Sequence, residues 1–112
     1  MEYKVVWSPK AKQGFFEVVK YLEANWSPHV VDDFLKKTFT TIKRIAQKPF
    51  SSRASITSGC YEVLVTKHNL MIYRVKDEMV QVIIIWDTRR NPKKKMRAMK
   101  TGMRSFDSTQ KR

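Results

Sequence analysis

One apolar run constrains the fold of this chain more than any other stretch. Residues 80–86, Val-Gln-Val-Ile-Ile-Ile-Trp, are rich in β-branched side chains, which is typical of a strand buried on both faces and therefore central in a sheet. The chain then turns polar at once, with Asp-Thr-Arg-Arg-Asn at 87–91 before Pro92. A rigid buried strand therefore delivers charged side chains to the edge of a sheet, which is a good position for a functional site.

The other apolar patterns predict two helices and three more strands. Ser8-Pro9 and Ser27-Pro28 each place an N-cap serine before a proline at the first helical position, so we expect helices over 9–25 and about 28–47. Strands are expected at 3–7, 61–65, 70–75 and 80–86, with a loop over 48–59. This β-α-α-β-β-β order predicts an α+β fold in which two antiparallel helices pack on one face of a mainly antiparallel four-stranded sheet.

Composition narrows the class of protein. A chain of 112 residues with 12% aromatic residues is expected to fold as one domain. The single cysteine, Cys60, excludes an intramolecular disulfide and fits a reducing compartment. Neither an apolar run of about 20 residues nor a signal-peptide pattern is present, so we expect a cytoplasmic protein that does not associate with membranes. Two distant histidines and three ungrouped glycines predict no metal site and no cofactor.

The positive charge of the chain is unevenly distributed. The formal net charge is +13, and residues 93–112 hold eight Lys/Arg against one acid, Asp107. We therefore expect a folded domain over 1–95 and a flexible basic tail over 96–112. A balance of this size favours polyanionic partners, either nucleic acid or an acidic protein.

The directions of the last three strands bring two polar clusters together. If these strands form a meander, the turn at Lys67-His68-Asn69 and the turn at Asp77-Glu78 lie at opposite edges of the sheet. The final strand then runs back, so residues 87–91 emerge beside Lys67-His68-Asn69. We expect the two clusters to be neighbours, although some twenty residues separate them in the sequence.

This edge offers groups for binding or for catalysis. In an RNA-cleaving site, His68 would transfer a proton and Arg89 would stabilise phosphate charge. As a binding edge, it would present cations and hydrogen-bonding groups to a target or to nucleic acid through Lys67, Asn69, Asp87, Arg89, Arg90 and Asn91. The simpler alternative is that Asp87 pairs with an arginine, Asn69 holds the turn, and His68 is an ordinary exposed residue.

The chain resembles the RelE/ParE superfamily, the toxins of bacterial type II toxin–antitoxin pairs. The resemblance covers residues 3 to about 95. It rests on the element order, Ser8-Pro9-Lys10-Ala11, Lys48-Pro49-Phe50, Tyr73-Arg74-Val75 and the basic end after Trp86. Residues 66–70 together with residues 86–92 are similar to a ParE-like branch in particular. The resemblance adds Arg74 to the candidate binding residues.

The resemblance implies a bacterial, plasmid-stabilising toxin that a cognate antitoxin holds inactive by wrapping over its helices and sheet. RelE-type members cleave mRNA on the ribosome with basic residues on the middle strands. Of that type's functional residues, this chain keeps only the arginine near the end of the last strand, at Arg89. It has Glu62 and Leu64 where that type has lysines, and Leu70 where that type has an arginine. Lys95 stands near the position at which that type has a C-terminal tyrosine. ParE-type members also lack that set, and they poison DNA gyrase instead.

Three functions therefore stay open. The first is a ParE-like toxin that inhibits gyrase or another essential target by binding. The second is a ribosome-dependent mRNA endonuclease with a rebuilt site around His68, Arg89 and Arg90. This is the only form in which we expect an enzyme. The third is a non-toxic module that binds nucleic acid or protein through its basic tail.

Overall fold

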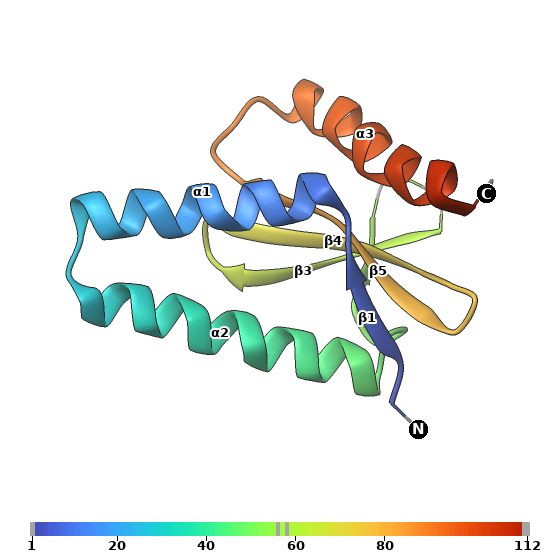
Figure 1. Cartoon of the computed structure of the whole chain (residues 1–112), viewed down its shortest axis with the longest axis horizontal. Helices are drawn as coiled ribbons and strands as arrows, with labels where there is room; N and C mark the ends of the chain where they lie inside the picture. The colour runs from blue at the N-terminus through green and yellow to red at the C-terminus, as the bar shows by residue number, and fades with distance from the viewer. Residues whose placement is uncertain (1, 56, 58, 111–112) are drawn as a thin grey trace.

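The structure, a computed structural model, describes residues 2–55, 57 and 59–110. Its elements are, in chain order, β1 (Lys4–Trp7), α1 (Pro9–Asn25), α2 (Pro28–Gln47), β2 (Arg53–Ala54), β3 (Cys60–Thr66), β4 (Asn69–Lys76), β5 (Met79–Asp87) and α3 (Pro92–Gln110). Figure 1 shows α1 and α2 as an antiparallel pair and α3 beyond α1. The predicted α+β class is confirmed, with two further elements, the short strand β2 and the helix α3.

Both predicted helices begin at their Ser-Pro pairs. Ser8 and Ser27 have extended backbone conformations, and a proline follows each of them at the start of α1 and α2. The Ser8 hydroxyl accepts a 2.9 Å hydrogen bond from the backbone N–H of Ala11, which satisfies a donor at the helix start. Ser8 is completely buried, so this cap is part of the core.

The sheet has the order β1-β5-β4-β3-β2, so β5 is an interior strand, as its apolar run predicts. β1 pairs with β5 in parallel, and the other neighbours are antiparallel. Asp77 and Glu78 both have positive φ, the conformation of a tight two-residue turn between antiparallel strands. The register with β4 shifts so that Tyr73 pairs with Val82 and Ile72 with Ile84. Ile83 is therefore the extra residue of a β-bulge.

The two faces of the sheet carry separate cores. On the first face, side chains of α1 and α2 such as Ala11, Phe34 and Ile45 pack against Met71 and Tyr73 of β4. On the second face, Met99 of α3 packs with a cluster from the strands: Cys60, Leu70, Ile72, Ile83, Ile84 and Trp86. Burying both faces explains why residues 80–86 read as one continuous apolar run.

Helix α3 differs from the flexible tail expected after residue 95. It runs from Pro92 to Gln110, and Met99, Met103 and Phe106 join the core of the second face. These three residues have helical spacing, but the surrounding lysines and arginines lower the mean hydropathy of the segment, and a tail was therefore the simpler interpretation. The division of the chain into a domain and a tail at residue 95 stays a prediction.

Across the described residues, no helix is both long and apolar enough to span a bilayer.

Candidate functional site

The structure brings the two polar clusters together, as the strand directions predict. Asn69 pairs with Asp87 at the end of the β4–β5 ladder. Beyond that pair, the backbone N–H of Thr88 donates to the carbonyl oxygen of His68 over 3.0 Å, and the Thr88 hydroxyl donates to the Lys67 carbonyl over 3.1 Å. The β3–β4 turn and the segment after β5 therefore form one connected edge.

Asp87 and Arg89 bind each other at this edge. The Arg89 side chain donates from Nε to Oδ1 over 3.1 Å and from Nη2 to Oδ2 over 3.0 Å, and its backbone N–H also donates to Oδ1. Hydrogen bonds from Arg89 hold the pKa of Asp87 below its usual value, and the positive charge of Arg89 lowers it further. Asp87 therefore stays ionised at neutral pH and is not available as a proton donor.

Several of the other candidate residues have structural partners. Asn69 donates to the Thr66 hydroxyl over 2.7 Å and so closes the β3–β4 turn. The Arg90 guanidinium lies 4.9 Å from the centre of the Trp86 ring, within the range of a cation–π contact. The Asn91 side chain accepts from the backbone N–H of Lys93 over 3.0 Å, which caps the start of α3. These contacts match the simpler alternative for Asn69 and Asp87, and functional roles for these residues stay predictions.

A groove of about 1130 Å³ joins this edge to the helices. Its wall at the strand ends includes Lys67, His68, Asn69, Asp87, Arg89 and Arg90. Sequence reasoning missed the remaining walls, which come from α1, α2 and α3 and include Lys10, Glu17, Tyr21, Asp33, Lys94 and Arg97. The sequence does not predict that these helices line the groove with the strand ends, because this depends on how α1 and α3 pack beside the end of β5.

Arg74 lies apart from the other candidates. It pairs with Gln81, at the other end of β4 and β5 from the Asn69–Asp87 pair. Its Nε donates to the Gln81 side chain over 2.7 Å, and its Nη2 donates to Asp107 of α3 over 2.8 Å. Its guanidinium also lies 6.0 Å from the centre of the Phe106 ring. Arg74 therefore links α3 to the sheet, outside the groove.

A second pocket, of about 660 Å³, opens on the second face of the sheet beside β3. Glu62 lines it and is only 6% exposed. One carboxylate oxygen of Glu62 accepts a 2.7 Å hydrogen bond from Arg53, and the other lies 3.7 Å from the Lys95 ammonium. Within the described residues, no group of three or more His, Cys, Asp or Glu side chains gathers as metal ligands would.

Comparison with known proteins places this fold. Residues 5–92 match the model of the family described as the ParE toxin of the type II toxin–antitoxin system, parDE. The chain belongs to the ParE toxin family. It is therefore a toxin of the type II toxin–antitoxin class, and the predicted superfamily is confirmed. None of the curated proteins matches the sequence.

Solved structures share the fold of this ParE-family toxin at low sequence identity. A chain of the chromosomal ParDE system from P. aeruginosa is 16% identical with a TM-score of 0.67, and the match covers 77% of this chain and 96% of that one. An E. coli RelE mutant in the free state is 16% identical with a TM-score of 0.55, and the match covers 80% of this chain and 86% of that one. A chain of a heterotetrameric YoeB–YefM toxin–antitoxin complex from Staphylococcus aureus is 18% identical with a TM-score of 0.52, and the match covers 80% of this chain and 100% of that one.

The family match ends at residue 92, where α3 begins. The groove and the paired strand ends therefore lie mainly in the part that matches the family, whereas α3 lies beyond it.

Proposed function

We propose that this ParE-family toxin acts in the cytoplasm by binding and inhibiting an essential target, with DNA gyrase the first candidate, and that a cognate antitoxin neutralises it. Membership of the ParE family supports gyrase over the ribosome. The observation that carries inhibition by binding is that three arginines of the sheet and its edge are engaged by carboxylates: Arg53 by Glu62, Arg74 by Asp107 and Arg89 by Asp87.

These pairs disfavour RNA cleavage because of what cleavage requires. A nuclease needs a base, an acid and cations that are positioned to take up charge developing on phosphate. The Arg89 guanidinium already meets both oxygens of Asp87, so a phosphate would have to compete with a carboxylate two residues away. His68 is the remaining proton-transfer candidate, and Arg89, which would stabilise phosphate charge beside it, is occupied by Asp87.

Side chains on the second face of the sheet also disfavour RNA cleavage. Glu62 is almost fully buried there between Arg53 and Lys95. A buried carboxylate repels phosphate and partly neutralises the two bases that would attract it. One of the two positions at which RelE-type members carry lysines is therefore occupied by an acid, Glu62, and this change supports the ParE-like interpretation.

The helical pair offers a surface for a protein partner. Four large aromatic side chains on α1, α2 and the α1–α2 connection are each more than half exposed: Phe16 (58%), Tyr21 (53%), Trp26 (59%) and Phe39 (70%). Exposed aromatic side chains are typical of protein interfaces. The antitoxin would cover these rings. A protein of the same fold, YoeB, is found in a heterotetrameric toxin–antitoxin complex with YefM.

Expression in bacteria tests the proposal. Wild type is expected to arrest growth, and co-expression of the small protein encoded next to it is expected to relieve the arrest. His68→Ala is expected to arrest growth as wild type does, with transcripts left uncut on translating ribosomes. Absence of arrest by wild type would favour the non-toxic module instead.

The endonuclease is the second candidate because His68 and Arg89 share one groove with Lys10, Lys67 and Arg97. It predicts the opposite outcome. Transcripts would be cut during translation, and either His68→Ala or Arg89→Ala would abolish both the cutting and the arrest.

A further inference from the structure

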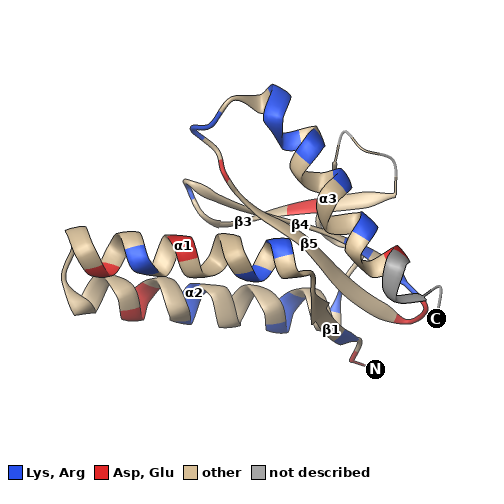
Figure 2. Cartoon of the chain, turned by 45° about the horizontal axis from the view of Figure 1, so that its top comes forward, with Lys and Arg blue, Asp and Glu red and all other residues tan. Residues whose placement is uncertain are grey.

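Four basic residues of α3 form a straight line on its exposed side. Lys93, Arg97, Lys100 and Arg104 follow one another at spacings of four, three and four residues, which places them on one face of a helix. All four are exposed. At 1.5 Å per residue the line extends over roughly 16 Å. We refer to these four residues as the basic stripe, and Figure 2 shows blue segments recurring along α3.

The opposite side of α3 fixes the stripe in place. Met99 is buried in the core of the second face, and Met103 and Phe106 pack against that core. Gly102 lies so close to β5 that a Cβ atom there would stand 2.3 Å from the carbonyl oxygen of Ile83. The stripe is therefore carried by a helix that is anchored along its length, and its charges keep a defined orientation relative to the sheet.

The acid of α3 does not neutralise the stripe. Asp107 is the only Asp or Glu from residue 92 to 110. Its carboxylate binds Arg74 over 2.8 Å and lies 3.6 Å from the Lys76 ammonium, so it serves the attachment of α3 to β4. The outward face of α3 is thus a one-signed surface.

The positive surface continues from α3 into the groove. Lys94 and Arg97 line the groove together with Lys10, Lys67 and Arg90. The acids on its walls are Glu17, Asp33 and Asp87, and two of these are paired, Asp33 with Lys37 and Asp87 with Arg89. Cations therefore outnumber unpaired acids both in the groove and along the basic stripe.

We propose that the basic stripe binds double-stranded DNA through its phosphates, without reading sequence. An α-helix has the width that the major groove of DNA accepts, and exposed lysine and arginine are the phosphate-binding residues of such helices. This role is independent of the toxin's target and lies outside the residues that match the family.

Other polyanions fit the stripe less well. Proteins that hold single strands stack bases on exposed aromatic rings, and the aromatic residue of α3, Phe106, packs inward under Arg74. Protein partners usually need an apolar centre, and the large exposed apolar residue of α3, Met96, lies beside the stripe at 38% exposure. Duplex RNA has a deep and narrow major groove that does not admit a helix.

Binding of a labelled duplex of about 20 base pairs, followed by fluorescence anisotropy, tests the proposal through its salt dependence. Four phosphate contacts predict a slope near −3.6 in log affinity against log salt, or roughly a 150-fold loss between about 50 and 200 mM. The stripe variant changes all four residues to Gln, as Lys93→Gln, Arg97→Gln, Lys100→Gln and Arg104→Gln. It is expected to lose most of this slope and at least about tenfold in affinity at the lower salt.

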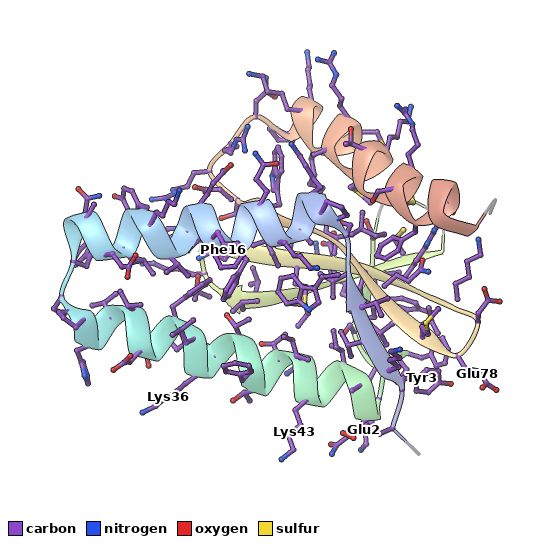
Figure 3. All side chains as sticks on the ribbon, viewed as in Figure 1. Glu2, Tyr3, Phe16, Lys36, Lys43 and Glu78 are labelled. Atoms are coloured by element: carbon purple, nitrogen blue, oxygen red, sulfur yellow. The ribbon has the colours of Figure 1, made fainter. Side chains whose placement is uncertain are left out.

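A matched control removes the same charge elsewhere, as Lys12→Gln, Lys20→Gln, Lys36→Gln and Lys43→Gln. These lysines are exposed on α1 and α2, and Figure 3 shows Lys36 and Lys43 pointing away from the rest of the molecule. The control is expected to keep the slope and to stay within about threefold of the wild-type affinity. An equal loss of affinity in the control would overturn the proposal that the stripe binds DNA, because it would show that net charge alone attracts DNA.

Three further ligands test the class of partner. Single-stranded DNA, duplex RNA and vesicles of anionic phospholipid are expected to bind more weakly than duplex DNA at equal salt, and equal or tighter binding of any of them contradicts the proposal. Circular dichroism checks that the stripe variant is folded. If it is not, the single change Arg97→Gln is expected to reduce the slope by about 0.9, and an unchanged slope overturns the proposal.

Discussion

The hydroxyl of Ser8 donates a 2.6 Å hydrogen bond to the carbonyl oxygen of Ile83, which lies 75 residues further along the chain. The same hydroxyl accepts from Ala11 and caps α1. Ile83 is the bulged residue of β5, and its carbonyl is also the atom that Gly102 of α3 approaches. One backbone carbonyl therefore lies where the helical pair, the central strand and α3 meet.

Removing the Ser8 hydroxyl is expected to destabilise the fold. Ser8→Ala loses a helix cap, worth about 1 kcal/mol, and leaves a buried carbonyl without its donor, which costs a further 1–3 kcal/mol or so. The free energy of unfolding, measured by urea denaturation, should fall by about 2–4 kcal/mol. Ser27→Ala is the matched control, because Ser27 begins α2 at an exposed position, and its loss should stay below about 1 kcal/mol. Equal losses would contradict the role of the Ile83 carbonyl.

Adding a methyl group at Gly102 tests how α3 packs. Alanine favours a helix over glycine by about 1 kcal/mol, but its Cβ would lie 2.3 Å from the Ile83 oxygen and 2.8 Å from its Cγ2. Because the oxygen is backbone, α3 must shift away, and we expect a net loss of about 1–3 kcal/mol in unfolding free energy.

The neighbouring change Thr101→Ala lies on the exposed side of α3 and should alter that free energy by less than about 0.5 kcal/mol. Stabilisation by Gly102→Ala would show that α3 does not pack closely on β5.

The attachment of α3 should also depend on pH. The hydrogen bond from Arg74 holds the pKa of Asp107 below its usual value, and the charge of Lys76 acts in the same direction. A carboxyl whose folded-state pKa is lowered contributes stability above its unfolded-state pKa, near 3.9, and loses it as pH falls through the folded-state value. The protection of α3 amides, which is the intrinsic exchange rate at a given pH divided by the observed rate, should therefore be high at neutral pH and should fall below about pH 4.

Asp107→Asn supplies the comparison. Its α3 amides should be less protected than those of wild type at neutral pH, and the further loss of protection at acid pH should disappear. Asp32→Asn removes an exposed carboxylate from α2 and should leave exchange in α3 unchanged. If Asp107→Asn behaves like Asp32→Asn, the contact between Asp107 and Arg74 does not hold the helix.

The sequence predicted most of the family fold, because its signals are local. The Ser-Pro pairs mark the starts of α1 and α2, and the β-branched run marks β5. The juxtaposition of Lys67-His68-Asn69 with residues 87–91 followed from strand direction alone and is confirmed by the pairing of Asn69 with Asp87. These features need no knowledge of how side chains pack.

The rest depended on packing over long distances in the sequence. β2 contains two residues, too few for a periodic pattern, and it exists through pairing with β3. Helix α3 packs inward through apolar residues that include Ala98, Met99, Met103 and Phe106, and these are set among many lysines and arginines in the sequence. The contact of Arg74 with α3 was not predicted either. Its partner Asp107 lies 33 residues further along the chain, on the helix that was interpreted as a tail.

The most direct test of inhibition by binding is a titration of the purified protein into a fixed amount of DNA gyrase, with supercoiling of relaxed plasmid as the readout. We expect supercoiling to fall as the protein approaches molar equivalence with gyrase, both for wild type and for His68→Ala. Restoration of supercoiling on adding the antitoxin would show that the antitoxin neutralises this inhibition of gyrase. Undiminished supercoiling and DNA cleavage by gyrase at a large molar excess of the protein would contradict gyrase as the target.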